Sequence, residues 1–565
     1  MKYSILADVY EELEKTSSKL GKTKIIADIL KKTSDEELER VVLLLRGSVF
    51  PSWSDEELGI ANQLVIKSVF KAYGINEKEV VKSFKKTGDL GLTLEEFSKQ
   101  KKQKTLIKEE LTVKRVFENL KKIAEQTGKG SQERKMNLVA ELISQASPKE
   151  VRYIVRTILF QLRVGVAEGI VRDSIAQAFD VSSKAVERAW FRNQDYGYIA
   201  KIAKEKGEKG LEEVKITLGS PVSVLLAEKA PSLEDALESF DKAAMEFKYD
   251  GMRAQIHKDK NKIWIYTRRL ENVTKAFPDL VEICRKHIKA DKCIVEGEAL
   301  AINPKTGKPL PFQRLSQRIK RKYDIEKTIE EIPVKIDFFD IIYLNGKSLF
   351  DKSFEQRREI LKKIIKVAPG KIELTKQLIT KDLKDAEEFY KKSLKEGQEG
   401  LMVKNLEAKY QPGRRVAGGW LKVKPTLESL DLAIIGATWG TGKRAGWLGS
   451  FILGCKDAKT ERFLECGMMG TGVKEKKTSS DDVTFASLTK MLKPYIVSEK
   501  GNKVKIEPKV VVEVAYEEIQ KSPTYSSGFA LRFPRLVRVR FDRRPEDVDD
   551  KKRIERIFKI QKGRK

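Results

Sequence analysis

Residues 243–269 read AAMEFKYDGMRAQIHKDKNKIWIYTRR, and this stretch decides how the middle of the chain is expected to fold. Apolar and polar residues alternate in AAMEFKYD, GMRAQIHKD and KIWIYTRR, and turn-forming residues separate these segments. Because side chains of a strand point alternately to its two faces, the alternation predicts three strands. The run KDKNK, at 258–262, predicts a hairpin tip. Lys248 would end the first strand, and residues 249–251 would form the next turn.

Strand signals continue along this part of the chain. KCIVEGEALAI at 292–302 and VKIDFFDIIYL at 334–344 predict further strands, and FEQRREILKKIIKV at 354–367 predicts a helix. The segment LGSPVSVLLAEKAPS, at 218–232, contains two prolines and predicts a connector. We therefore expect an α/β (α+β) domain over residues 216–426.

The regions on either side have different patterns. In residues 1–215, apolar residues recur three and four positions apart, as in DEELERVVLLLRG at 35–47, which predicts an all-α domain. After the central domain, LDLAIIGATWG, GWLGSFILGC and RFLECGMMG predict short strands with glycine turns. Several such strands suit a small barrel, so we expect an OB-fold over residues 427–565.

Charge indicates the kind of partner. Lys and Arg outnumber Asp and Glu by 112 to 83, a formal charge of +29. Such an excess favours a polyanionic partner, most commonly nucleic acid, although a lysine-rich soluble surface would also explain it. No CxxC pair occurs among the four cysteines, which argues against a structural zinc site.

Two absences bear on location. No run of about 20 apolar residues occurs, so no membrane span is expected. The N-terminal sequence lacks the apolar run and cleavage site of a signal peptide. We therefore expect an intracellular protein, cytoplasmic and associated with the nucleoid.

Lys248, in the motif KYDGMR, is the candidate nucleophile. A lysine amine is mostly protonated in water, and burial or neighbouring positive charge must lower its pKa before it can attack. Alone, the motif fits a surface hairpin with a charged turn better than a reactive site.

Other chemically active residues follow in a fixed order, and this order changes the interpretation. Each group alone has an ordinary structural explanation, but six groups within one domain favour a common function. Their types suit phosphoryl transfer: cations bind phosphates, carboxylates hold a divalent metal and an aromatic ring stacks on a base. The groups after Lys248 are Arg268 and Arg269; Glu296 and Glu298; Phe338, Phe339 and Asp340; Glu399 and Lys404; and Lys422 and Lys424.

These motifs, in this order, resemble the covalent nucleotidyltransferase superfamily, and more closely the archaeal and eukaryotic ATP-dependent DNA ligases. The resemblance covers nearly the whole chain. LRVGVAEGIVRDSIAQAF at 162–179 is similar to the family's helical DNA-binding domain. LRFPRLVRVRFDRRPED at 531–547 is similar to the end of its OB-fold domain.

The resemblance implies roles for individual residues in binding and transferring the nucleotide. Lys248 would carry AMP as a phosphoramide, Glu298 would contact the ribose or a metal, and Glu399 would be a metal-side carboxylate. Phe339 would line the adenine pocket, with Phe338 as the register alternative. The other nucleotide contacts implied are Glu246, Arg253, Arg268, Lys422, Lys424 and Arg415, for which Arg414 is the alternative.

DNA contacts are implied as well. In the family two phenylalanines press into the minor groove beside the nick, and PFQRL and RFPRL resemble those sites at Phe312 and Phe533. Core packing is the alternative explanation for both rings. Arg540 and Arg543 belong to the last motif, which is usually Arg-x-Asp-Lys but here ends in arginine. That departure leaves the role of Arg543 open, because arginine differs from lysine in shape and donor geometry.

The resemblance also implies cofactors and partners. We expect ATP, Mg²⁺ with Mn²⁺ as the alternative metal, and nicked double-stranded DNA bound by a monomer. QKTLI, at 103–107, resembles a short sliding-clamp motif, although an apolar pair beside a helix explains it equally well. Two other functions stay open at this point: a GTP-dependent RNA-capping guanylyltransferase and a non-catalytic nucleic-acid-binding scaffold.

Overall fold

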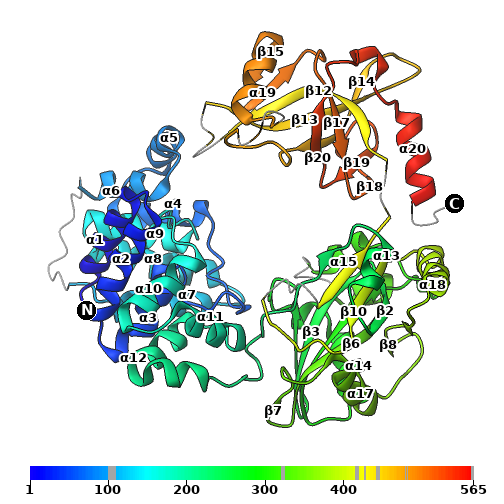
Figure 1. Ribbon diagram of the computed structural model, residues 1–565. Coiled ribbons are helices and arrows are strands. Elements are labelled where there is room, and N and C mark those ends of the chain that lie inside the picture. The colour runs from blue at the N-terminus through cyan, green and yellow to red at the C-terminus, as the bar shows by residue number, and fades with distance from the viewer. Residues whose placement is uncertain are drawn as a thin grey trace. The chain divides into compact units, whose positions relative to one another are not determined.

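The structure, a computed structural model (Figure 1), divides into two compact units. The first comprises Met1–Glu228, Gly251–Thr375 and Lys404–Trp420, and the second comprises Lys229–Asp250, Lys376–Val403 and Leu421–Lys565. The domain bounds expected near residues 215 and 427 stay a prediction. The structure describes residues 1–99, 110–319, 325–413, 419–425, 428–440, 444, 446–477, 479 and 482–561.

The N-terminal region is helical, as the apolar spacing predicts. Its helices share one core, in which Leu6, Tyr10 and Val41 are fully buried. Sequence signals set the boundaries: α9 begins at Pro148 behind a capping box that Ser147 starts. The helices are α1 (Tyr3–Lys15), α2 (Lys19–Lys32), α3 (Asp35–Leu45), α4 (Asn62–Tyr73), α5 (Glu77–Thr87), α6 (Leu90–Lys99), α7 (Val113–Glu125), α8 (Ser131–Gln145), α9 (Pro148–Ile158), α10 (Glu168–Phe179), α11 (Ser183–Arg192) and α12 (Tyr196–Glu212).

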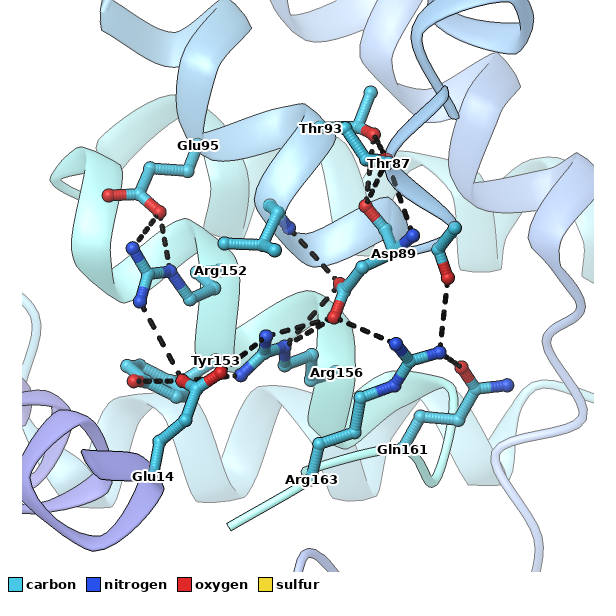
Figure 2. Close-up of polar contacts among 12 residues, drawn as sticks. Glu14, Thr87, Asp89, Thr93, Glu95, Arg152, Tyr153, Arg156, Gln161 and Arg163 are labelled. Carbon is cyan, nitrogen blue, oxygen red and sulfur yellow. Dashed lines mark hydrogen bonds and ion pairs between the residues drawn. The ribbon is translucent and has the colours of Figure 1, made fainter. Parts of the chain in front are cut away.

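A charged cluster lies between helices of this region (Figure 2). Arg156 of α9 is almost fully buried and donates to Asp89 and Glu14 over 2.8–3.1 Å. Burial raises the pKa of the Asp89 carboxyl, but the hydrogen bonds and charge of Arg156 outweigh burial, and this pKa is lowered. Arg163 reaches the same carboxylate at 3.2 Å from a side chain that is 46% exposed.

The central region contains two sheets. In the first unit, the strand order is β4-β3-β5-β6-β7, with β8 parallel to β6. A five-stranded sheet has the order β1-β11-β10-β2-β9 and carries Lys248 at the end of β2. The strands are β1 (Glu228–Lys229), β2 (Ala243–Lys248), β3 (Met252–Asp259), β4 (Lys262–Thr267), β5 (Lys292–Ala301), β6 (Val334–Leu344), β7 (Lys347–Ser348), β8 (Ile372–Leu374), β9 (Gln377–Ile379), β10 (Gly400–Asn405) and β11 (Trp420–Val423).

The register of the first sheet positions polar side chains together. β3 and β5 are antiparallel, with Arg253 opposite Glu298 and Gln255 opposite Glu296. Residues two apart share a face, so these four side chains lie on one face of the sheet. The helices of the central region are α13 (Leu233–Glu238), α14 (Pro278–His287), α15 (Phe312–Ile319), α16 (Ile325–Glu331), α17 (Phe354–Ile364) and α18 (Leu383–Lys395).

The C-terminal region is rich in strands. One sheet has the order β14-β13-β12-β16-β15, and β17 connects β12 to β20. Within the described part of the chain no strand pairing closes this sheet into the expected barrel. The elements are β12 (Leu430–Trp439), β13 (Leu448–Lys456), β14 (Phe463–Met469), β15 (Ile496–Lys500), β16 (Lys503–Ile506), β17 (Val511–Ala515), β18 (Glu518–Lys521), β19 (Phe529–Arg532), β20 (Arg535–Val539), α19 (Phe485–Leu492) and α20 (Lys551–Ile560).

The expected fold class is confirmed: a helical N-terminal region, an α/β central region and a β-rich C-terminal region of the OB type. No described helix has both the length and the apolar character required to cross a membrane.

The charged cluster of the helical region generates a stability prediction. Arg156→Met keeps much of the side-chain volume but leaves Asp89, which is 4% exposed, without its buried partner. We expect a loss of about 3–5 kcal/mol in the free energy of unfolding, measured by denaturant titration of the full chain. Arg163→Met is the matched control: it removes an exposed contact to the same carboxylate and should cost about 0–1 kcal/mol. Equal losses in the two variants would show that burial does not set the strength of these pairs.

Candidate active site

Lys248 lies at the end of β2 and faces one carboxylate. Its Nζ is 2.8 Å from Glu399 Oε2, and Lys424 Nζ lies 2.8 Å from the same oxygen. Lys424 also contacts Glu517 at 3.3 Å. Backbone pairing keeps the first contact in place, because the Glu399 N–H donates to the Lys248 carbonyl oxygen over 2.8 Å. A single carboxylate therefore holds two ammonium groups in the second unit.

This arrangement has electrostatic consequences. Burial raises the pKa of the Glu399 carboxyl, but the charges and hydrogen bonds of Lys248 and Lys424 outweigh burial and lower this pKa strongly. Burial also lowers the pKa of the Lys424 amine, but Glu399 and then Glu517 raise it above its ordinary value. The carboxylate is thus kept ionised, and its charge is divided between two cations.

The turn after Lys248 is held by specific contacts. The Asp250 N–H donates to Gln398 Oε1 over 3.2 Å, and the Lys376 N–H donates to the Tyr249 hydroxyl over 3.3 Å. Gly251 allows a close backbone approach, because a Cβ at this position would lie 2.5 Å from the carbonyl oxygen of Ala299. The glycine of the KYDG motif therefore has a steric explanation.

The first unit holds a second set of expected residues around Arg253. Its guanidinium donates to Glu296 over 2.8 Å. It also lies 5.3 Å from the ring centre of Phe339 and 5.5 Å from that of Trp420. Lys404 is 1% exposed, and its Nζ lies 4.4 Å from the Phe339 ring centre and 4.2 Å from that of Trp420. Two cations thus contact the same pair of aromatic rings.

The structure separates the two phenylalanines of the FFD motif. Phe338 belongs to the hydrophobic core of the first unit and is fully buried. Phe339 lies outside that core and packs edge-on against Trp420, with ring centres 5.7 Å apart. Of the two register alternatives, Phe339 is the one beside Arg253.

Other expected nucleotide residues occupy varied positions. Glu246 is buried on β2 and accepts a hydrogen bond from Gln377 over 3.0 Å. Glu298 lies on β5, Arg268 is exposed in the turn after β4, and Lys422 lies on β11. Arg414 and Arg415 lie outside the described residues, as does the 103–107 segment.

The expected DNA-contact residues differ in exposure. Phe312, at the start of α15, is half-buried against the core of the first unit, whereas Phe533 is 64% exposed with a φ of +51°. A positive φ in a bulky residue is a strained conformation that occurs at functional sites. Arg540 is held by Asp431 at 2.9 Å and by Asp542 at 2.8 Å.

The last arginine of that motif is held more loosely. Arg543 Nε lies 3.7 Å from Asp431, and its side chain is 45% exposed. Its guanidinium therefore has a solvent-facing side, whereas that of Arg540 is 13% exposed.

Four residues near Arg253 were not singled out from the sequence: Gln255, His257, Tyr410 and Trp420. The sequence could have indicated Gln255 and His257, because polar side chains at buried strand positions require hydrogen-bond partners. No sequence pattern indicated Tyr410, because it lies far along the chain from Arg253. Among the described residues, no three His, Cys, Asp or Glu side chains converge as a metal-binding group.

Comparisons with known proteins find matches in the helical, central and C-terminal regions of the chain. Residues 2–176 match the family described as DNA ligase N terminus, residues 224–424 match ATP dependent DNA ligase domain, and residues 444–543 match ATP dependent DNA ligase C terminal region. A solved structure named Pmar-Lig_PreS3 has a TM-score of 0.53 and 17% identity over 94% of this chain and 99% of its own, which supports the fold.

Full-length relatives are much closer in sequence. The DNA ligase of Nanoarchaeum equitans is 50% identical over 564 residues, which cover 100% of this chain and 99% of the relative. The DNA ligase of Thermococcus onnurineus is 49% identical over 562 residues, which cover 99% of this chain and 98% of the relative. With the helical, central and C-terminal regions all matched, the chain belongs to the archaeal-type ATP-dependent DNA ligases, enzymes that seal nicks in DNA.

Proposed function

We propose that Lys248 is the nucleophile through which this ATP-dependent DNA ligase joins a 3′-hydroxyl to a 5′-phosphate. The main support is the contact of Lys248 and Lys424 with one carboxylate, Glu399. The second lysine places positive charge where a phosphate must approach. Neither the RNA-capping function nor a silent scaffold is favoured by any feature of this site.

The reaction would proceed in three steps. The deprotonated Lys248 amine attacks the α-phosphate of ATP, a P–N bond forms and pyrophosphate leaves. The AMP then passes to the 5′-phosphate of the nick, which frees the lysine and makes AMP the leaving group. Finally the 3′-hydroxyl attacks that phosphate, the phosphodiester bond forms and AMP is released.

The remaining nucleotide residues have proposed binding roles. Phe339 would stack on adenine and Glu246 would lie beside the base. Glu298 would contact the ribose or a metal. The cations proposed to bind the nucleotide are Arg253, Arg268, Arg415, Lys422 and Lys424.

A divalent metal is proposed as well. Mg²⁺ usually binds one or two carboxylates together with substrate phosphates and retained water, and Mn²⁺ accepts similar ligands. Glu399 fits such a role, because its carboxylate is ionised and lies beside Lys248. Glu298 is the second candidate ligand. A metal bound here would neutralise phosphate charge.

DNA binding is proposed to involve the exposed aromatic and basic residues. Phe533 and Phe312 would press into the minor groove, and the exposure and strained backbone of Phe533 support its part most strongly. Arg540 and Arg543 would contact DNA phosphates, or the departing pyrophosphate in the first step. The chain has 112 basic and 83 acidic residues, and this excess of positive charge predicts DNA binding that weakens steeply with salt.

Further partners are proposed on the sequence alone. Residues 103–107 would bind a sliding clamp, and the ligase would work as a monomer. Because its substrate is genomic DNA, we expect it in the cytoplasm at the nucleoid.

The nucleophile is tested by covalent labelling. With ATP labelled at the α-phosphate, wild-type protein should form an acid-resistant protein–AMP adduct, and Lys248→Ala and Lys248→Arg should form none, since neither retains a lysine amine at this position. Lys362→Ala, which removes an exposed lysine paired with Glu359, is the control and should label normally. If Lys248→Ala formed the adduct at the wild-type level, Lys248 would not be the nucleophile.

The charge arrangement is tested through Lys424. Glu399→Gln removes the carboxylate that most raises the pKa of the Lys424 amine, so this pKa should fall. Competitive acetylation followed by mass spectrometry measures the pH at which Lys424 becomes reactive, and that midpoint should move to lower pH. Glu517→Gln, which removes a carboxylate 54% exposed at 3.3 Å, should move it less. A larger shift in Glu517→Gln would contradict the assigned order of charges.

A further inference from the structure

The connector before the central region is bound along strand β3 by side chains. Three of its residues, Gly219, Val222 and Leu225, have both backbone polar groups engaged by side chains from β3 and nearby elements. We call residues 219–225 the belt. Because the β3 residues involved are 253, 255 and 257, they share one face of the strand.

The first two belt residues are bound as follows. The Gly219 N–H donates to His257 Nδ1 over 3.2 Å, and the Tyr266 hydroxyl donates to the Gly219 carbonyl. The Val222 N–H donates to Gln255 Oε1 over 2.8 Å, and Gln255 Nε2 donates to the Val222 carbonyl over 3.0 Å. Burial lowers the pKa of His257 to about 3, which keeps the ring neutral and able to accept this bond.

The third belt residue connects directly to Arg253. The Leu225 N–H donates to the Tyr410 hydroxyl over 3.1 Å, and Arg253 Nη1 donates to the Leu225 carbonyl over 2.7 Å. Both side chains also donate to Glu296 Oε2, Arg253 over 2.8 Å and Tyr410 over 3.0 Å. Gln255 Nε2 donates to Glu296 Oε1 over 3.2 Å. One fully buried carboxylate therefore joins the belt to the guanidinium.

The opposite side of the belt is also bound. The Ser223 N–H donates to the Phe191 carbonyl over 3.1 Å, and Gln194 Nε2 donates to the Ser223 hydroxyl over 2.6 Å. Ser220 and Asn193 are in hydrogen-bond contact at 3.3 Å. The belt is thus held both by β3 and by the end of α11 with the segment that follows it.

Two further buried donors lie beside this network. Arg253 Nε and Trp420 Nε1 are buried, and neither has a hydrogen-bond acceptor among the described residues. A buried donor without an acceptor is costly, so such groups call for an explanation. A bound nucleotide, which is rich in oxygen acceptors, would supply one.

We propose that Tyr410 and Glu296 are positioning residues that fix the guanidinium of Arg253 for nucleotide binding by locking it to the belt. This inference rests on the proposed nucleotide contact of Arg253. Neither residue touches the nucleotide; both act through Arg253. Occupation of the site and order in the connector are then linked, because the same hydrogen bonds serve both.

The matched pair Tyr410→Phe and Tyr266→Phe tests the proposal. Each removes one hydroxyl bound to the belt backbone, but only Tyr410 also contacts Glu296. In lysyl-AMP formation, Tyr410→Phe should raise the half-saturating ATP concentration about tenfold and leave the maximal rate within about twofold. Tyr266→Phe should leave both within about twofold. Hydrogen exchange of the belt amides should rise in both variants.

Further variants separate this proposal from the function on which it rests. If wild-type protein forms no lysyl-AMP, the proposed function of the site is wrong. If Arg253→Lys leaves the half-saturating ATP concentration unchanged, the proposed nucleotide contact of Arg253 is wrong. If Arg253→Lys raises it but Tyr410→Phe does not, or if both tyrosine variants raise it equally, the positioning role is wrong. Tyr410→Phe combined with Arg253→Lys should be no worse than Arg253→Lys alone, and additive effects would count against action through Arg253.

A second substitution tests the same role from the carboxylate. Glu296→Gln keeps the shape of the side chain but loses the charge that holds Arg253. It should raise the half-saturating ATP concentration at least as much as Tyr410→Phe. All variants are assayed below their measured melting temperatures, and equal ATP dependence of folded Tyr410→Phe and folded Tyr266→Phe overturns the proposal.

Discussion

The buried carboxylate of Glu296 is the constraint on which the centre of the first unit depends. A fully buried anion is costly unless donors surround it, and here Arg253, Tyr410 and Gln255 supply them. Each donor also binds backbone of the belt. The hydrogen bonds that stabilise the Glu296 carboxylate therefore also hold one face of β3, Tyr410 and the connector in place.

Buried charges in the other regions also need partners of opposite charge, but the degree of pairing differs. In the helical region, Arg156 is the buried charge and Asp89 and Glu14 are its counterions. In the C-terminal region, Arg540 is enclosed by Asp431 and Asp542, whereas Arg543 keeps an exposed guanidinium. Paired charges of the first kind hold helices together, and a partly paired charge such as Arg543 remains able to bind a phosphate.

The Lys248 cluster is built differently, because two ammonium groups share one carboxylate. Lys248 and Lys424 share the single carboxylate of Glu399, and Glu517 makes only a longer, exposed contact. The two lysines thus face two carboxylates, but only Glu399 contacts both ammonium groups. In the proposed function, the phosphates of the nucleotide would bind beside these two lysines.

Much of the fold was predictable from the sequence, because periodicity follows directly from local geometry. The helices of the first 215 residues, the hairpin at Lys260 and Asn261, and the strands containing Glu296 and Phe339 all lie where the patterns place them. The closed barrel was not found among the described residues, since closure depends on which distant strands pair and alternation within each strand does not determine that.

The sequence by itself determined which chemical groups are present and their order, and with the family resemblance this identified a DNA ligase. Only the tertiary structure decided how those groups pair. Glu296 and Glu298 are equivalent in a strand pattern, yet only Glu296 is fully buried beneath Arg253 and Tyr410. Phe338 and Phe339 are likewise adjacent, but opposite faces of β6 send one into the core and the other toward Arg253 and Trp420. The physical reason is that burial and charge pairing depend on segments distant in the chain, such as Leu225 and Tyr410, whose meeting no local pattern encodes.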